Sequence, residues 1–372
     1  MARSGGGDPK TATLSSVAEA NRAVIVATLR EHGPMSRREL TERTGLSTAT
    51  VNRLVGGLRT SKIVTETEQG ASTGGRPPQI IQFNAAAQSV LAFDIGTKRM
   101  TGAIVDLENR VLHRQEWDHE PGGDTSMQVY EQLLRLCQEL CERATALGSP
   151  ARVIGLSVPG VVRDDTGMVE FAPALRWWSM PIGRLLAERI GLPVVAENNV
   201  NVLAVAEHRH GAGRGVDDLA MIVRGAGVGA GLILGGRPHR GFRGGAGEIG
   251  YMLMEPSSLD RPWPGYGDLD LRLGLESTGK HTGKSIDEST DRSAGLVDQL
   301  ALAVANLSVV VSPELVVLGG VLGDDPEAVA ARVSGRLVGR IPTPPRIVVS
   351  RMVDAGLIGA AEMAMEGIPA QA

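Results

Sequence analysis

Four short segments of the chain carry residues that could hold a ligand. They are rich in glycine or in carboxylate, amide and hydroxyl side chains, and they lie at the ends of apolar runs typical of buried strands. The segments are residues 94–97 (DIGT), 157–160 (SVPG), 197–199 (ENN) and 225–231 (GAGVGAG). In α/β folds, ligands bind beyond the carboxyl ends of the strands. One such turn is weak evidence, because glycine-rich turns are often only hairpins, but four in this order indicate a binding cleft.

The residues around these segments alternate between strand and helix patterns. Strands are predicted near residues 90–95, 101–106, 110–115, 153–158, 193–197, 219–224 and 314–320. Helices are predicted near 126–147 and 294–311, and a further helix follows residues 197–199 and ends near residue 210. This order predicts two α/β lobes with a cleft between them. We place the first lobe at residues 88–210 and the second at 211–354, and expect a C-terminal helix at 355–370 to pack back on the first lobe.

Residues 36–63 indicate a second kind of chemistry, the reading of DNA. Ser36 and Glu39 form an S-x-x-E capping box, Gly45 supplies a turn, and Ser47 caps the following helix. In that helix the spacing i, i+3, i+4, i+7 is occupied by Val51, Leu54, Val55 and Leu58. Such a stripe faces a small core, so the polar side chains of the first turns are left to enter a DNA groove.

The surrounding residues complete a winged helix-turn-helix at 16–84, behind an arm at 1–15 that is predicted to be disordered. A first helix is expected at 16–31, and two short strands at 63–67 and 79–83 form the wing. The wing tip carries an arginine that suits a phosphate or the minor groove. The predicted DNA-binding residues are Arg37, Ser47, Thr48, Thr50, Asn52, Arg53 and Arg76. A winged helix used for protein contact is the alternative.

Charge supports this division of the chain. Residues 1–84 hold 11 Lys and Arg against 7 Asp and Glu, whereas the rest hold 27 against 35. A basic head on an acidic body fits a head that meets phosphate.

Other classes of protein are disfavoured by the composition. No apolar run reaches the roughly 18 residues of a membrane span, and the N-terminus lacks the apolar core of a signal peptide. The two cysteines, Cys137 and Cys141, have helical spacing, so we expect reduced thiols in a cytoplasmic protein that has no membrane partner.

Longer matches make the chain resemble the ROK family of repressors, open reading frames and kinases. The body carries DIGTKRMTGAIVD at 94–106, GLSVPGVV at 155–162, ENNVNVLAVAEHRHGAG at 197–213, GAGVGAGL at 225–232, GGAGEIGY at 244–251 and PELVVLGG at 313–320. The head resembles the ROK repressor head through SRRELTERTGLSTATV and GGRPP. The resemblance covers residues 16–372 and implies an actin-like, sugar-kinase fold for the body.

The resemblance also implies a sugar in the cleft. The sugar-binding residues that it assigns are Pro159, Gly160, Asn198, Asn199, Glu248 and Tyr251. Carboxylates and amides can bond vicinal hydroxyls and reject analogues that lack them. Two alternatives stay open: Glu248 could be a structural turn carboxylate, and Asn198 could cap the backbone. Trp177 and Trp178 either line the cleft or pack in the core.

Departures from the family pattern argue against catalysis. Where the kinases carry an Asp that takes the proton from the sugar hydroxyl, this chain has Asn199, which has no titratable carboxylate. Val223 and Ala226 replace threonines of the second phosphate loop, and Thr97 replaces a glycine of the first. The phosphate turns are therefore read as vestigial, with Asp94, Gly96, Thr97, Gly225 and Gly227 as their residues.

The zinc ligands of many family members are also missing. Tyr251 stands in place of the family histidine, and residues 256–270 contain no cysteine. A structural Zn²⁺ needs thiolate and imidazole ligands, so no metal or other cofactor is predicted. Asp270 either replaces a sugar-binding Glu that usually follows the cysteines or is a solvated loop residue.

These observations together predict a sugar-responsive, DNA-binding transcriptional regulator, a repressor of carbohydrate uptake or metabolism genes. Its expected partners are a double-stranded DNA operator, a sugar or sugar-phosphate effector, and further copies of itself in a homodimer or homotetramer. Two alternatives are kept. One is a DNA-binding kinase that phosphorylates a hexose, and the other is a constitutive DNA-binding protein whose body serves assembly alone.

Overall fold

The computed structural model describes residues 14–67, 79–118, 126–163, 166–260, 265–273 and 291–366. Most of the N-terminal arm, the wing-tip Arg76, residues 261–264 of the segment without cysteines, and residues 367–370 of the predicted C-terminal helix lie outside the described residues.

The N-terminal head is a winged helix-turn-helix, as predicted. It contains α1 (Leu14–His32), α2 (Arg37–Thr44) and α3 (Thr48–Thr60), and its three strands are ordered β1 (Met35–Ser36), β3 (Ile80–Phe83), β2 (Val64–Thr67). The Ser36–Glu39 capping box forms in both directions, and Gly45 ends α2 in the left-handed conformation with φ 69°. The apolar stripe of α3 is buried in the head core with Ile25 and Leu40.

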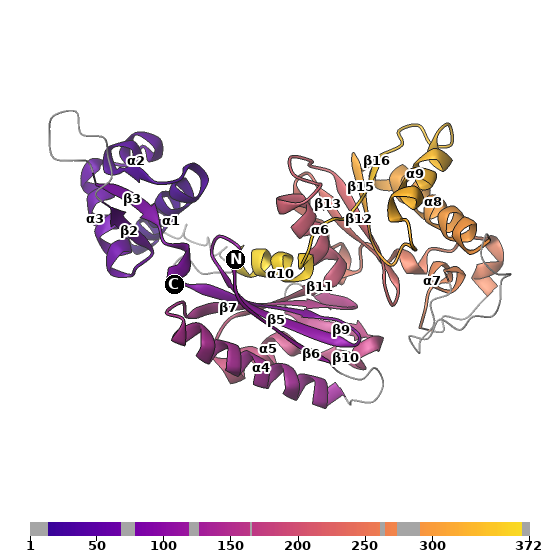
Figure 1. Ribbon diagram of the computed structural model, residues 1–372, viewed down its shortest axis with the longest axis horizontal. Helices are drawn as coiled ribbons and strands as arrows, with labels where there is room; N and C mark the ends of the chain where they lie inside the picture. Colours follow the sequence, from indigo (N-terminus) through magenta and orange to yellow (C-terminus); the bar gives the residue numbers. More distant parts are fainter. Residues whose placement is uncertain are drawn as a thin grey trace, which may run out of the picture.

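The first lobe of the body is built on a five-stranded sheet. Its order is β11 (Val194–Asn198), β7 (Ala151–Val158), β4 (Ser89–Ile95), β5 (Arg99–Asp106), β6 (Val111–Asp118). Helices α4 (Ser126–Ala146) and α5 (Ile182–Ile190) cover one face of this sheet (Figure 1). A small sheet that the sequence did not predict lies beside it, ordered β10 (Trp177–Met180), β9 (Met168–Ala172), β8 (Val161–Arg163).

The second lobe repeats the five-stranded arrangement. Its sheet is ordered β14 (Arg237–Pro238), β13 (Val228–Leu234), β12 (Leu219–Arg224), β15 (Leu315–Gly320), β16 (Arg346–Val349). Helices α7 (Asp268–Arg272), α8 (Asp291–Val311) and α9 (Pro326–Leu337) belong to this lobe. The two-lobed α/β body predicted from the alternating pattern is therefore confirmed.

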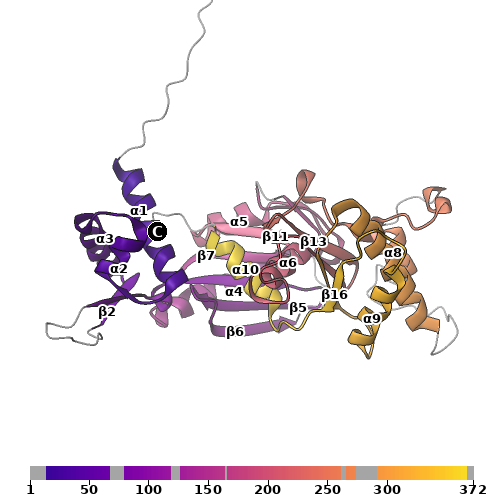
Figure 2. The ribbon, with the colours of Figure 1, turned by 90° about the horizontal axis from the view of Figure 1, so that it is seen from above.

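Two helices lie between the sheets, α6 (Asn199–His210) and α10 (Ala355–Glu366), as Figures 1 and 2 show. A shared apolar cluster joins them to both lobes and includes Val90 of β4, Val205 of α6, Leu315 of β15 and Leu357 of α10. Helix α10 packs mainly on β4 and β7 of the first lobe and α6 mainly on β12 and β13 of the second, and the two helices pack on each other. A change in the angle between the lobes must therefore move side chains around α6 and α10.

Candidate ligand cleft and DNA-reading helix

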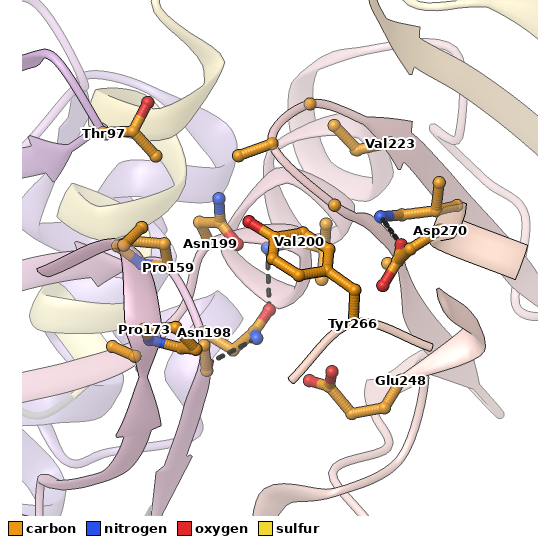
Figure 3. Close-up of a pocket in the computed structure, with 18 of the residues that line it drawn as sticks. Thr97, Pro159, Pro173, Asn198, Asn199, Val200, Val223, Glu248, Tyr266 and Asp270 are labelled. Carbon is orange, nitrogen blue, oxygen red and sulfur yellow. Dashed lines mark hydrogen bonds between the residues drawn. The ribbon is translucent and has the colours of Figure 1, made fainter. Parts of the chain in front are cut away.

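A cavity of about 310 Å³ opens between the lobes, at the strand ends where the sequence placed it. Figure 3 shows Thr97, Pro159, Asn198 and Asn199 on its first-lobe side and Val223, Glu248 and Asp270 on its second-lobe side. The cavity wall brings together most of the predicted site, namely Gly96, Thr97, Pro159, Gly160, Asn198, Asn199, Gly225, Gly227, Glu248 and Tyr251. Its volume is at the small end of the range for ligand pockets, about 300–1,000 Å³.

Asn198 caps α6 with its side chain. Its Oδ1 accepts from the N–H of Val200 (2.8 Å) and Asn201 (3.4 Å), and its Nδ2 donates to the Gly160 carbonyl (2.6 Å). The side chain thus ties the start of α6 to the turn after β7, which is the capping alternative considered for this residue. Asn199, the first residue of α6, lines the cavity beside it.

Glu248 faces the cavity from the turn before the short 3₁₀ helix at Ile249–Tyr251. Burial raises the pKa of its carboxyl group to about 7, and the nearby charge of Asp270 adds to the effect. The group is therefore poised between a carboxylate, which only accepts hydrogen bonds, and a carboxylic acid, which also donates one.

Glu248 is expected to make stability pH-dependent. Because its pKa is raised from 4.5 to about 7, the stability it contributes is fully present below pH 4.5 and is lost as pH rises through 7. Glu248→Gln should remove this loss. The free energy of unfolding of the variant, relative to that of the wild type, should therefore rise by on the order of 3 kcal/mol between pH 5 and pH 8. Urea unfolding at the two pH values measures the difference. Glu131→Gln, an exposed change on α4, is the control, and equal pH slopes for all three proteins would contradict the prediction.

Asp270 is a structural carboxylate of the cleft and not a solvated loop residue. It is 5% exposed, and its oxygens accept from the N–H of Val228 (2.7 Å) and of Gly267 (3.1 Å). A Cβ at Gly250 would lie 2.5 Å from its Oδ1, so only glycine allows this approach. Asp270 therefore holds the β12–β13 hairpin against the loop that carries Tyr266 and lines the cavity.

The phosphate-loop side of the cleft has few side-chain donors. Val223 and Ala226 line the cavity here, and the Gly225 N–H donates to the Gly227 carbonyl within the same turn (2.8 Å). Asp94 is not among the residues that line the cavity. Its Oδ1 accepts from Ser157 Oγ (2.7 Å), and burial raises the pKa of this carboxyl group, an effect that the bond partly offsets.

An ion pair between a buried carboxylate and a half-buried arginine, which the sequence did not reveal, joins the two lobes beside the cleft. Glu197, at the end of β11, is 2% exposed and pairs with Arg240 from the loop after β14. The same carboxylate accepts from the Asn198 N–H (2.9 Å) and Asn201 Nδ2 (3.0 Å). The pair therefore connects the second lobe to the start of α6.

In the head, α3 presents the polar side chains predicted to read DNA. Asn52 and Arg53 are exposed, as are Ser47 and Thr48, while Thr50 is half-buried and its hydroxyl lies 2.9 Å from Ser47 Oγ. Arg37 differs, because its guanidinium pairs with Glu66 of β2 and donates to Gln79 (3.2 Å). It thus also braces the wing against α2, a role that the sequence did not indicate.

Two absences apply to the described residues. No group of three His, Cys, Asp or Glu side chains among them could hold a metal ion. No helix in the described part of the chain is long and apolar enough to cross a membrane.

These features define a class of protein, a winged helix-turn-helix head joined to a two-lobed body of the sugar-kinase type. A family model for winged helix-turn-helix DNA binding matches residues 22–59, and the model of the ROK family matches residues 90–262. The body of the chain therefore matches the ROK family over residues 90–262, as its motifs predicted.

The relatives include regulators. The chain is 30% identical to a xylose repressor of Caldicellulosiruptor bescii over 63% of its own length and 58% of the relative. It is 27% identical to the DNA-binding transcriptional dual regulator NagC of Escherichia coli over 68% and 61%. The chain thus spans about three fifths of the length of the curated relatives it matches.

A solved structure extends the likeness of fold to the whole molecule. It is a ROK family transcriptional regulator described as a homolog of the E. coli MLC protein, with a TM-score of 0.75 and 22% identity. The match covers 93% of this chain and 96% of that one, so the head and body of this chain share their fold with a regulator.

Proposed function

We propose that this chain is a sugar-responsive transcriptional regulator, a repressor in which a sugar bound in the cleft controls DNA binding by the winged helix-turn-helix. The observation that carries the proposal is the cavity between the two lobes, at which helix α6 begins, together with the turn at the far end of α6 that contacts the head. Regulators among its relatives, named for xylose and N-acetylglucosamine, support a sugar as the ligand.

The contact between head and body is made by the turn that follows β5. Leu107 packs against both the head core and the cluster between the lobes, and its N–H donates to the Ala85 carbonyl (3.2 Å). Asp106 Oδ1 fixes the turn by accepting from the N–H of Glu108 and of Arg110, both at 2.9 Å. A movement of this turn is therefore transmitted to the base of the head.

The same turn is bonded to the far end of α6. Asn109 Nδ2 donates to Glu362 of α10 and lies 3.4 Å from Nε2 of His210, the last residue of α6. Glu362 also pairs with Arg209 (2.6 Å) and His210 (2.8 Å). Because α6 starts in the cavity at Asn199, one helix about 18 Å long spans from the ligand to the head contact. Lobe closure on a sugar would shift this helix and so reposition the head.

The cleft is proposed to bind a sugar without acting on it. Asn199 has no carboxylate to take a proton from a sugar hydroxyl, and Val223 and Ala226 offer no hydroxyl to a phosphate. The residues proposed to contact the sugar are Pro159, Gly160, Asn199, Glu248 and Tyr251, and the assignment includes no bound zinc. Asn198, whose side chain caps α6, also lines the cavity.

DNA binding is tested with the full chain and DNA from upstream of its own coding region. We expect a specific complex that survives competitor DNA at moderate salt, formed by two copies on half-sites one or more helical turns apart. A gel shift across protein concentrations measures it, and the absence of a specific shift would count against the proposal. A coupled assay for ADP with hexoses is run in parallel, since turnover would show that the cleft is a kinase site.

A further inference from the structure

We propose that the mouth of the cleft holds a second sugar ring, stacked on the exposed indole of Trp178, so that the effector is a disaccharide or a longer oligosaccharide. This inference rests on the proposed function, because it extends the same cleft.

Two adjacent tryptophans have opposite environments. Trp177 is 1% exposed and its Nε1 donates to the Ser126 carbonyl (3.1 Å), so it belongs to the core of the first lobe. Trp178 is 57% exposed. The packing alternative therefore holds for Trp177, whereas the indole of Trp178 faces water.

The indole of Trp178 continues the wall of the cavity. Trp178 lies directly opposite Phe171 in the pairing of β10 with β9, so the two side chains share a face of the small sheet. Their ring centroids are 6.4 Å apart at 71°, an edge-to-face contact that orients the indole. Phe171 itself lines the cavity, together with Pro173 and Ala174. An apolar surface thus runs from the cavity out to Trp178.

The backbone on either side of Trp178 is held in a costly conformation. Arg176 and Ser179 have φ values of 55° and 50°, in the left-handed region that favours glycine. Strain of this kind persists where the fold over-determines it and is concentrated at ligand clamps. Both residues are exposed.

A sugar ring is the chemistry that fits this surface. One face of the ring presents C–H groups, which pack on an indole, while its edge presents hydroxyls that need polar partners. The cavity of about 310 Å³ is at the small end of the range for ligand pockets. A linked second ring would project to the mouth, where Trp178 covers it.

Calorimetric titration of the full chain with three matched pairs tests the inference. The pairs are glucose with cellobiose, xylose with xylobiose, and N-acetylglucosamine with its β-1,4 dimer. For at least one pair we expect the dimer to bind about tenfold more tightly, equivalent to about 1.4 kcal/mol. Trp178→Ala should abolish this gain and leave the affinity for the monosaccharide within about twofold, because an exposed side chain contributes little to folding. Trp178→Phe should keep part of the gain.

The outcomes separate this inference from the proposed function. Equal affinity for monosaccharide and dimer, or a Trp178→Ala variant that weakens both alike, overturns the second ring and leaves a monosaccharide sensor. If none of the six sugars binds the wild-type chain, the second ring is overturned, whereas the sugar-sensing function is decided separately by a wider panel that includes sugar phosphates.

Discussion

Arg240→Met is expected to destabilise the protein by about 3 kcal/mol or more, the largest effect of any single change considered for the cleft. The substitution leaves the Glu197 carboxylate, 2% exposed, without its only described cationic partner. Two remaining donors, the Asn198 N–H and Asn201 Nδ2, both bond its Oε1, so Oε2 loses the guanidinium. Urea unfolding measures the change.

Controls for this prediction come from the same hairpin and the same pair. Arg237→Met removes an exposed arginine of β14 and should stay within about 0.5 kcal/mol of the wild type. The double variant Glu197→Gln/Arg240→Met removes both charges and should recover part of the loss, since a neutral buried pair avoids the uncompensated charge. If Arg240→Met matches Arg237→Met, the ion pair does not hold the lobes together.

Arg53→Ala is expected to weaken operator binding by about 1–3 kcal/mol and to relax the sequence preference at one position of the site. Arg53 is exposed in the first turns of α3, one residue after Asn52, where a recognition helix contacts base edges. Asn52→Ala should act in the same way. Both changes leave the buried face of α3 intact, so the head should keep its fold.

Titrations on operator and on random DNA over a range of salt measure this effect. The slope of log affinity against log salt should change by no more than about one for Arg53→Ala, because a base contact adds less to it than phosphate contacts do. Arg184→Ala, an exposed change on α5 of the body, is the control and should alter neither affinity nor slope. Equal losses on operator and random DNA would contradict the assignment of Arg53 to base reading.

Local signals predicted the head well. The capping box of Ser36 and Glu39, the turn at Gly45 and the stripe of α3 depend on residues three or four apart, so a short window contains the whole interaction. Arg37 was assigned to DNA only, because its partner Glu66 lies 29 positions away and no local pattern links them.

The cleft was predicted in place but not in detail. The turns at the strand ends located the cleft. The sequence could not show that the Asn198 side chain caps α6, or that Asp270 is buried against the β12–β13 hairpin. The Glu197–Arg240 pair spans 43 positions and two lobes, so only the fold brings it together. The small sheet of β8, β9 and β10 was missed because its strands are short and their apolar alternation is broken.

Control of the head by the cleft is measured most directly as operator affinity with and without a saturating sugar, once a thermal-shift panel of sugars and sugar phosphates has identified one that binds. We expect the sugar to change the operator dissociation constant of the wild-type chain by at least about tenfold. Asn109→Ala, which loosens the turn between α6 and the head, should bind both the sugar and the operator but show a smaller change. A sugar that binds the wild-type cleft and leaves the operator dissociation constant unchanged would contradict the claim that the cleft controls the head.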